Sequence, residues 1–327
     1  MSVSTRRRLA LPGVLASALL AGVLGSAPAA SAAPAASAAP AAAPASSAAA
    51  PSTTAAAEAG GTVFGSAVQV RPGELLPAAL LRIEKEQGHL GVVRRFQTTP
   101  QPSIFKPLAD RSGIISFKLA PDRVLAGVYD AEFRAFFAAA PKNQPTWWSF
   151  SHEPDVAYKS GALKDLAQYR AAYRRVALMA RASGNTQLKN ALILFYYTAN
   201  PKSGLKITDF WPGADLTDVI AWDNYNGWST NQGFYGDPIP TLAADKAASD
   251  AVGKPWAIAE FGSVVINGDT AGRAAWITKF SQYAHSNGAK FVSYFDVNSN
   301  DGGGLYRLSD SDAQRAYYDV VSDQNPF

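Results

Sequence analysis

The sequence predicts an α/β protein, with residues 61–327 forming a single (β/α)8 or TIM barrel. Eight short apolar segments alternate with segments of helical periodicity in this part of the chain. Its length suits one barrel, for which roughly 250 residues are typical. The first connection lacks the G-x-G-x-x-G pattern that opens a doubly wound nucleotide-binding sheet. A closed barrel is therefore favoured over an open sheet.

Each expected strand is a short run of apolar residues that ends near Gly, Pro, Asn, Asp or another polar residue. The eight runs are 62–68, 91–96, 113–117, 146–152, 190–196, 218–223, 255–260 and 290–296. Because parallel barrel strands present their carboxyl ends at one mouth, residues that close these runs are expected to lie near one another.

Helices are expected between several of these strands. The clearest pattern has apolar residues every three or four positions from Leu163 to Met179 and ends at Gly184. A second helix is expected over 270–285, before Gly288, and the last over 312–321. The connection 97–112 is poor in helical periodicity, so no regular α-helix is expected there.

The first 60 residues are not expected to join the barrel. Arg6, Arg7 and Arg8 precede an apolar stretch and the small-residue run 30–32, so residues 1–32 are predicted to be a signal peptide. Either the general or the twin-arginine export route fits this leader. Residues 33–60 are mostly Ala, Pro, Ser and Thr, which predicts a disordered linker. We therefore expect a secreted protein, extracellular or associated with the cell wall.

Composition narrows the function classes. The formal net charge is +4, and three of these charges lie in the predicted signal peptide, so a nucleic-acid-binding surface is not indicated. The chain has no cysteine, which excludes disulfides, thiolate metal sites and cysteine nucleophiles. No histidine cluster is present, so no metal site or cofactor is predicted. No G-x-S-x-G motif is present, so no serine nucleophile is predicted. No run after the signal peptide is long enough to span a bilayer, and we expect a monomer.

Two glutamates close apolar strands. Glu153 follows the fourth run and Glu260 ends the seventh, so both are expected at the barrel mouth. Glycoside hydrolysis uses one protonated carboxyl group and one carboxylate, which makes these two residues the candidate catalytic pair. A single strand-end glutamate is more often a rim residue in an ion pair or a helix cap. The occurrence of two, on strands four and seven, favours catalysis.

Three motifs resemble the catalytic strands of glycoside hydrolase clan A, and most closely family 26. They are Ser151-His152-Glu153-Pro154, Trp222-Asp223-Asn224-Tyr225 and Ala259-Glu260-Phe261-Gly262. The histidine before Glu153 favours family 26, because clan relatives place asparagine there. The eighth strand departs from the family pattern, since Ser293-Tyr294-Phe295 stands where a tryptophan is common.

The resemblance implies a retaining mechanism with assigned roles. Glu153 would be the acid/base and Glu260 the nucleophile, while the Tyr225 hydroxyl would contact Glu260. His152 would be an active-site residue, although simple strand alternation points it away from Glu153 unless the strand end is irregular. The alternative, that His152 makes a structural hydrogen bond behind the barrel, stays open.

Further substrate-binding candidates come from strand ends. Flat aromatic rings can stack on the apolar faces of sugars, which favours Trp228, Tyr197 and Tyr294. Asp223 would bond sugar hydroxyls or the barrel rim. Arg94 and Arg95 are adjacent, and we take Arg95 as the candidate substrate-binding residue. Either arginine could instead face Glu260 or form an external ion pair.

These observations predict a secreted endo-β-glycanase that acts on a polysaccharide or oligosaccharide. The resemblance puts β-1,4-mannan first, with β-xylan and β-glucan as alternatives. Two hypotheses from other classes are a non-catalytic glycan-binding barrel and a structural cell-wall protein tethered by residues 33–60.

Overall fold

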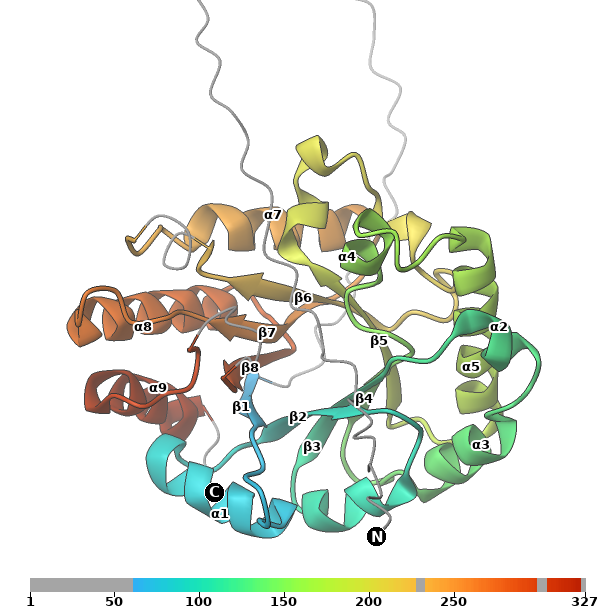
Figure 1. Ribbon diagram of the computed structural model, residues 1–327, viewed down its shortest axis with the longest axis horizontal. Helices are drawn as coiled ribbons and strands as arrows, with labels where there is room; N and C mark the ends of the chain where they lie inside the picture. The colour runs from blue at the N-terminus through green and yellow to red at the C-terminus, as the bar shows by residue number, and fades with distance from the viewer. Residues whose placement is uncertain (1–60, 228–232, 299–304, 325–327) are drawn as a thin grey trace, which may run out of the picture. The chain divides into compact units, whose positions relative to one another are not determined.

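The computed structural model describes residues 61–227, 233–298 and 305–324. Within them, eight parallel strands form a closed barrel in chain order, with β8 paired to β1 (Figure 1). The strands are β1 (Val63–Val68), β2 (Val92–Gln97), β3 (Ser112–Phe117), β4 (Thr146–Ser149), β5 (Leu188–Phe195), β6 (Val219–Tyr225), β7 (Trp256–Gly262) and β8 (Phe291–Asp296). The predicted (β/α)8 barrel is confirmed.

The strand ends differ from the expected ones at the three motifs that contain Glu153, Tyr225 and Glu260. Strand β4 stops at Ser149 rather than at His152, because Ser151 leaves the parallel ladder and forms an isolated antiparallel bridge with Lys118. Strands β6 and β7 instead run further than expected, to Tyr225 and Gly262. These changes decide which side chains reach the mouth.

Helices surround the barrel (Figure 1). The α-helices are α1 (Leu76–Gln87), α2 (Pro121–Leu125), α3 (Asp130–Ala139), α4 (Pro154–Lys159), α5 (Leu166–Ala182), α7 (Ile239–Ala251), α8 (Thr270–Ser286) and α9 (Ser311–Gln324). The 3₁₀ segments in the described ranges are η1 (Pro102–Leu108), η2 (Tyr196–Ala199), η3 (Pro201–Ser203) and η4 (Ile207–Asp209). The expected lack of an α-helix in 97–112 is confirmed, since only η1 forms there, with prolines at its start and inside it.

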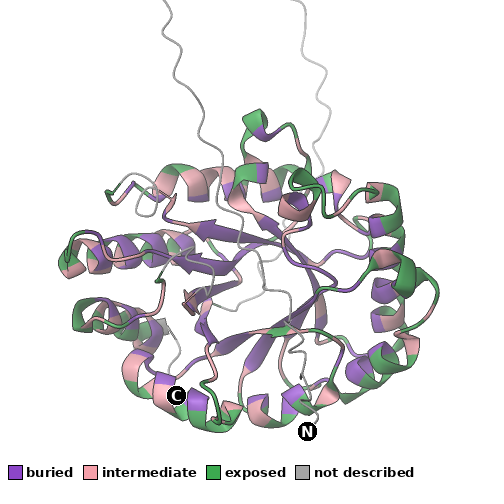
Figure 2. Ribbon diagram, viewed as in Figure 1, coloured by how far each residue is buried: buried purple, intermediate pink, exposed green. Residues whose placement is uncertain are grey.

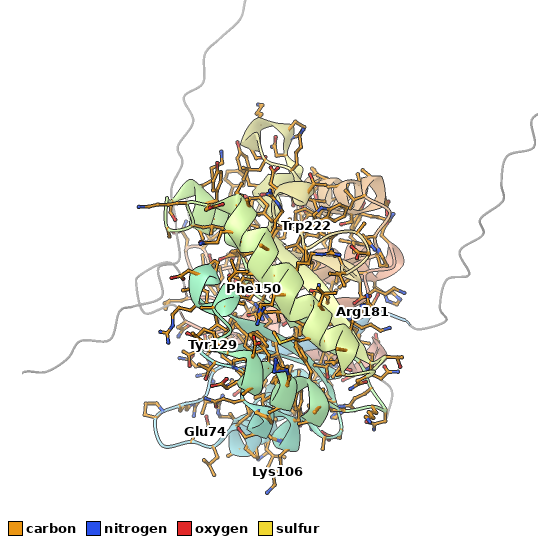
Figure 3. All side chains as sticks on the ribbon, turned by 90° about the vertical axis from the view of Figure 1, so that its right-hand side faces the viewer. Glu74, Lys106, Tyr129, Phe150, Arg181 and Trp222 are labelled. Carbon is orange, nitrogen blue, oxygen red and sulfur yellow. The ribbon has the colours of Figure 1, made fainter. Side chains whose placement is uncertain are left out.

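The core has two layers, separated by the strands. One lies inside the barrel, where Trp147 packs on Phe291 with ring centroids 4.7 Å apart. The other fills the space between barrel and helices. Phe150, which is labelled in Figure 3, belongs to this layer. Its ring packs on those of Tyr169 and Tyr173 in α5. Because both faces of a parallel strand are covered, the strands are buried almost throughout (Figure 2). None of the helices in the described ranges is long and apolar enough to cross a membrane.

Gly65 in β1 is fixed by close packing against β2. A Cβ added there would lie 1.7 Å from the carbonyl oxygen of Val92 and 2.6 Å from its carbon. These are backbone atoms, so no side-chain rotation can relieve the clash. Position 65 therefore requires glycine for the β1–β2 pairing.

We expect Gly65→Ala to lower the free energy of unfolding by at least about 3 kcal/mol, because the added methyl must force the two strands apart. Urea unfolding followed by circular dichroism measures the change. Gly61→Ala is the matched control, since a Cβ at Gly61 meets nothing within 4 Å. Equal stability of the two variants would contradict the close approach.

Candidate active site

A buried ion pair lies at the centre of the barrel mouth. The guanidinium of Arg94 (β2) donates from Nη2 to Glu260 Oε1 at 3.0 Å, and the Tyr225 hydroxyl (β6) donates to Glu260 Oε2 at 2.6 Å. Arg94 is fully buried and Glu260 is 5% exposed. Burial and the charge of Glu260 raise the pKa of Tyr225 well above its ordinary value, so the phenol stays a donor. Glu260 therefore has the surroundings of an ionised carboxylate.

An irregularity in β7 turns Glu260 into the mouth. Ala257 and Ala259 point into the barrel and Ile258 into the helix layer, so plain alternation would send Glu260 outward. The pairing register shifts between Ile258 and Phe261, so that Phe261 packs outward while Glu260 reaches Arg94. Such a bulge can re-aim a side chain in this way.

Glu153 lies just beyond β4, where the backbone is strained. Its φ of 49° and ψ of 48° are left-handed, an uncommon conformation for a residue other than glycine. Its backbone N–H donates to the carbonyl of Ile193 at 3.0 Å, which ties the turn to β5. The buried Asp155 carboxylate fixes the next residues by accepting from Phe195 N at 3.0 Å and from Thr198 Oγ1 at 2.6 Å. The surrounding contacts thus stabilise a strained conformation at the site.

The carboxyl group of Glu153 differs electrostatically from that of Glu260. Burial, then the charges of Glu260 and Asp155, raise the pKa of Glu153 to about 8, against smaller opposing effects of Lys118 and Arg94. Its side chain makes no hydrogen bond within the described part of the chain. Glu153 is therefore mainly protonated at neutral pH and lies close enough to Glu260 to sense its charge. The two strand-end glutamates meet at one mouth.

His152 belongs to the same polar network. Its Nδ1 lies 3.0 Å from Ser116 Oγ, which accepts a hydrogen bond from Arg94 Nη1 at 2.8 Å. Burial, Lys118 and Arg94 lower the pKa of His152 well below its ordinary value, so the imidazole is neutral at neutral pH. The ring also contacts Phe96 edge-on, with centroids 5.1 Å apart. The early end of β4 thus places His152 in the site rather than behind the barrel.

Asp223 lies in the barrel beside Glu260, with which it pairs in register across β6 and β7. It is fully buried, and neither carboxylate oxygen has a hydrogen-bond partner in the described residues. Burial, then the charges of Glu260 and Glu153, raise the pKa of Asp223 well above its ordinary value. The expectation that Asp223 bonds sugar hydroxyls or the rim is wrong for this structure, because the side chain offers no accessible surface.

The two neighbouring arginines of β2 point in different directions. Arg94 faces Glu260, whereas Arg95 donates to the carbonyl of Val68 at 2.9 Å and contacts neither glutamate. Alternation along the strand explains the difference. Tyr197 is 43% exposed on η2, so its role as a sugar-stacking residue stays a prediction. Trp228 lies outside the described residues.

Tyr294 requires a correction. It is fully buried in the helix layer, where its ring packs on Phe261 and Tyr317. It cannot present a surface to a substrate. Alternation along β8 instead turns Phe295 toward the mouth, with its ring centroid 5.7 Å from that of Tyr225 and 6.4 Å from that of Phe96.

Tyr306 is a residue of the mouth that the sequence did not reveal. Its ring lies 4.9 Å from Tyr225 and 6.1 Å from Phe295, and both neighbours lie at the carboxyl ends of their strands. The buried Arg273 of α8 fixes its backbone, donating to the Tyr306 carbonyl at 2.6 Å and to Asp310 at 2.6 Å. Tyr306 follows strand eight in a polar segment, and only its aromatic character signalled a site role.

The described ranges contain no group of three or more His, Cys, Asp or Glu side chains that could hold a metal ion. The mouth instead has a hydrogen-bonded network of Arg94, Glu260, Tyr225, Ser116 and His152, and the carboxyl group of Glu153 interacts electrostatically with Glu260. Such a network can donate a proton from Glu153 and present a charged carboxylate at Glu260.

The fold occurs in glycoside hydrolases of known structure. The catalytic domain of a family 26 endo-β-1,4-mannanase from Bacillus sp. JAMB-750 aligns with a TM-score of 0.59 and 13% identity, over 81% of this chain and 86% of that one. An endo-β-1,4-mannanase double mutant of Cellulomonas fimi aligns with a TM-score of 0.56 and 14% identity, over 80% of this chain and 71% of that one.

A broad-specificity family 5 endoglucanase from Clostridium longisporum is also similar, with a TM-score of 0.55 and 13% identity over 76% of this chain and 86% of that one. No protein-family model and no curated protein matches the sequence. At this identity the likeness establishes a shared barrel fold, and the argument about chemistry rests on the site.

The pKa of Glu153 provides a test of the site that does not depend on activity. In Glu260→Gln we expect this pKa to fall, because the charge that opposes ionisation of Glu153 is removed. In Lys118→Met we expect it to rise, because a positive charge that favours ionisation is lost. NMR titration of ¹³C-labelled glutamate carboxyls measures both shifts.

Lys142→Met serves as the control, since it removes one exposed positive charge outside the mouth network. It should leave the titration of Glu153 unchanged. An unchanged pKa of Glu153 in Glu260→Gln would mean that the two carboxyl groups are too far apart to act together.

Proposed function

We propose that this protein is a secreted, retaining endo-β-glycanase of glycoside hydrolase clan A, most similar to family 26. The observation that carries the proposal is the different state of two glutamates at one mouth. Glu153 has a raised pKa of about 8, whereas Glu260 accepts hydrogen bonds from Arg94 and Tyr225. A retaining glycosidase needs this pair, one acid and one charged nucleophile.

In the proposed reaction, Glu153 protonates the oxygen of the scissile glycosidic bond while Glu260 attacks the anomeric carbon. The bond to the leaving sugar breaks, and a covalent glycosyl-Glu260 ester forms. Glu153, now ionised, then removes a proton from a water molecule that attacks the same carbon and releases Glu260. Proton and charge balance over the two steps, and the anomeric configuration is retained.

The aromatic residues of the mouth support a sugar ligand. Phe96 is 40% exposed, and Phe295 and Tyr306 are partly buried beside Tyr225. Flat rings of this kind stack on the apolar faces of sugar rings. For the substrate, β-1,4-mannan remains the first choice because of the family 26 resemblance, and β-xylan or β-glucan are the alternatives.

A non-catalytic glycan-binding barrel would need the aromatic residues but not the polar network. The buried pair of Arg94 and Glu260 costs desolvation free energy, which binding alone does not explain. A structural cell-wall protein would need neither feature. Secretion is proposed from the signal-peptide pattern of residues 1–32 and the linker composition of residues 33–60.

A reducing-sugar assay over mannan, glucomannan, xylan, mixed-linkage β-glucan and β-1,3-glucan tests the proposal. We expect release of reducing ends from at least one β-1,4-linked polymer. No release from any polymer by the folded protein, combined with binding to one of them, would favour the glycan-binding alternative.

The two glutamates should respond differently to substitution. Glu260→Ala should abolish turnover, whereas Glu153→Ala should lose roughly 10²–10⁴-fold on polymer but keep the first step for an aryl glycoside with a good leaving group. Azide should then restore turnover of Glu153→Ala by attacking the glycosyl-Glu260 intermediate, giving a β-glycosyl azide. NMR of the product identifies its anomer. A β-glycosyl azide from the Glu260 variant instead would reverse the two roles.

Activity should decline at alkaline pH. Glu153 must be protonated to act as the acid, so kcat/KM should fall as pH rises past about 8, where Glu153 ionises. Lys118→Met should move this alkaline limb upward, because loss of the positive charge raises the pKa of Glu153. The pH profile of kcat/KM measures both effects. A limb that does not respond to Lys118→Met would belong to another group.

A further inference from the structure

A cavity of about 370 Å³ lies beside the catalytic mouth, among the carboxyl end of β2, the start of α1 and η1. Its polar lining consists of Arg95, Gln97, Thr98, Gln101 and Ser103. Phe96 also lines it, and the ring of Phe96 contacts His152 and lies under the guanidinium of Arg94 at 4.2 Å. One side chain is thus shared by the cavity and the site.

Arg95 has no carboxylate partner in the described residues. Its Nη1 donates to the Val68 carbonyl at 2.9 Å, and its buried Nε has no hydrogen-bond partner. Burial lowers its pKa, with no nearby negative charge to offset the loss of hydration. By contrast, Arg94 on the same strand is compensated by Glu260. The guanidinium of Arg95 therefore has unused donors and an unbalanced charge.

We propose that this cavity binds the carboxylate of an acidic sugar residue, with Arg95 as the recognising group. This inference rests on the proposed glycanase function, and it adds that the preferred glycan carries uronic acid units, which would put an acid-substituted β-xylan or β-glucan ahead of neutral β-1,4-mannan. The guanidinium fork matches a carboxylate in geometry and charge. None of the described residues that line the cavity is acidic, so no side chain there repels an anion.

The rest of the lining favours a sugar over a small inorganic or organic anion. Gln101, Thr98 and Ser103 provide amide and hydroxyl groups for sugar hydroxyls, while Leu76, Ile104 and Pro107 provide apolar surface. The volume lies in the roughly 300–1,000 Å³ range of small-ligand sites. Lys118, another cation of the mouth, forms no ion pair in the described residues and adds to the positive potential for an acidic glycan.

The test measures binding to Glu260→Gln, which is expected to bind glycans without cleaving them. The probes are a disaccharide with a terminal glucuronate, the same disaccharide with glucose in that position, and sodium acetate. Isothermal titration calorimetry should show the acidic disaccharide binding about tenfold or more tightly than the neutral one. Adding Arg95→Met should remove this preference and leave affinity for the neutral disaccharide within about twofold.

Two further variants separate recognition from folding and from general charge. Arg95→Lys keeps the charge without the planar fork, so it should retain part of the preference. Arg134→Met removes a positive charge from the exposed face of α3 and should leave the preference unchanged. If Arg95→Met does not fold, the affinities of the two disaccharides are compared between Glu260→Gln alone and Glu260→Gln with Arg95→Lys. A smaller preference for the acidic disaccharide in the second variant then supports the inference, and an unchanged preference contradicts it.

Equal affinity for the two disaccharides, or a preference that survives Arg95→Met, would overturn the inference. Acetate binding as tightly as the acidic disaccharide would also overturn it, since the cavity would then recognise only a small anion. If the protein hydrolyses glycans but shows no acidic preference, this inference alone fails. If it binds the acidic disaccharide through Arg95 but hydrolyses nothing, the proposed function fails and the acidic-sugar site stands.

Discussion

The candidate site depends on placing a guanidinium inside a barrel. Arg94 is fully buried, and a buried charge is tolerated only when it is paired and hydrogen-bonded. Its two side-chain partners, Glu260 and Ser116, come from different strands, and Ser116 links the network to His152. Removing either partner would leave polar atoms unpaired in a desolvated space. The arrangement is thus maintained mainly because an unpaired buried polar atom would cost free energy, and less because each single hydrogen bond stabilises the fold.

The balance of positive and negative charges explains why Glu153 and Glu260 differ in protonation state. Three carboxyl groups, those of Glu153, Asp223 and Glu260, interact in a site where the fully buried Arg94 is the cation that touches one of them. One guanidinium can balance one carboxylate, and Glu260 is the group it touches. Ionising a second carboxyl group would leave a negative charge buried without a partner, so the protonated forms of Glu153 and Asp223 are favoured. The protonation pattern follows from this imbalance.

The sequence predicted the barrel and the meeting of Glu153 with Glu260 because both follow from apolar runs and from the common direction of parallel strands. It could not separate Arg94 from Arg95, since alternation gives opposite faces but not which face is inside. It misplaced Tyr294 for the same reason, because a one-residue change in phase exchanges it with Phe295. His152 depended on where β4 ends, and that end is set by a bridge between Ser151 and Lys118, distant in sequence.

The rim of the mouth is determined by contacts that no local pattern contains. Tyr306 reaches Tyr225 because Arg273, on α8, holds the Tyr306 carbonyl while it also binds Asp310 before α9. Arg273 also donates to the Tyr294 hydroxyl, which in turn donates to the Tyr306 carbonyl, so the buried tyrosine of β8 anchors the segment that supplies the partly buried Tyr306. The sequence resembles family 26 but lacks the tryptophan that is common at this strand, and the aromatic rings beside Tyr225 are those of Phe295 and Tyr306. Because two smaller rings on separate segments present a differently shaped surface from one indole, the substrate suggested by the family resemblance does not follow from the fold and has to be tested on this protein.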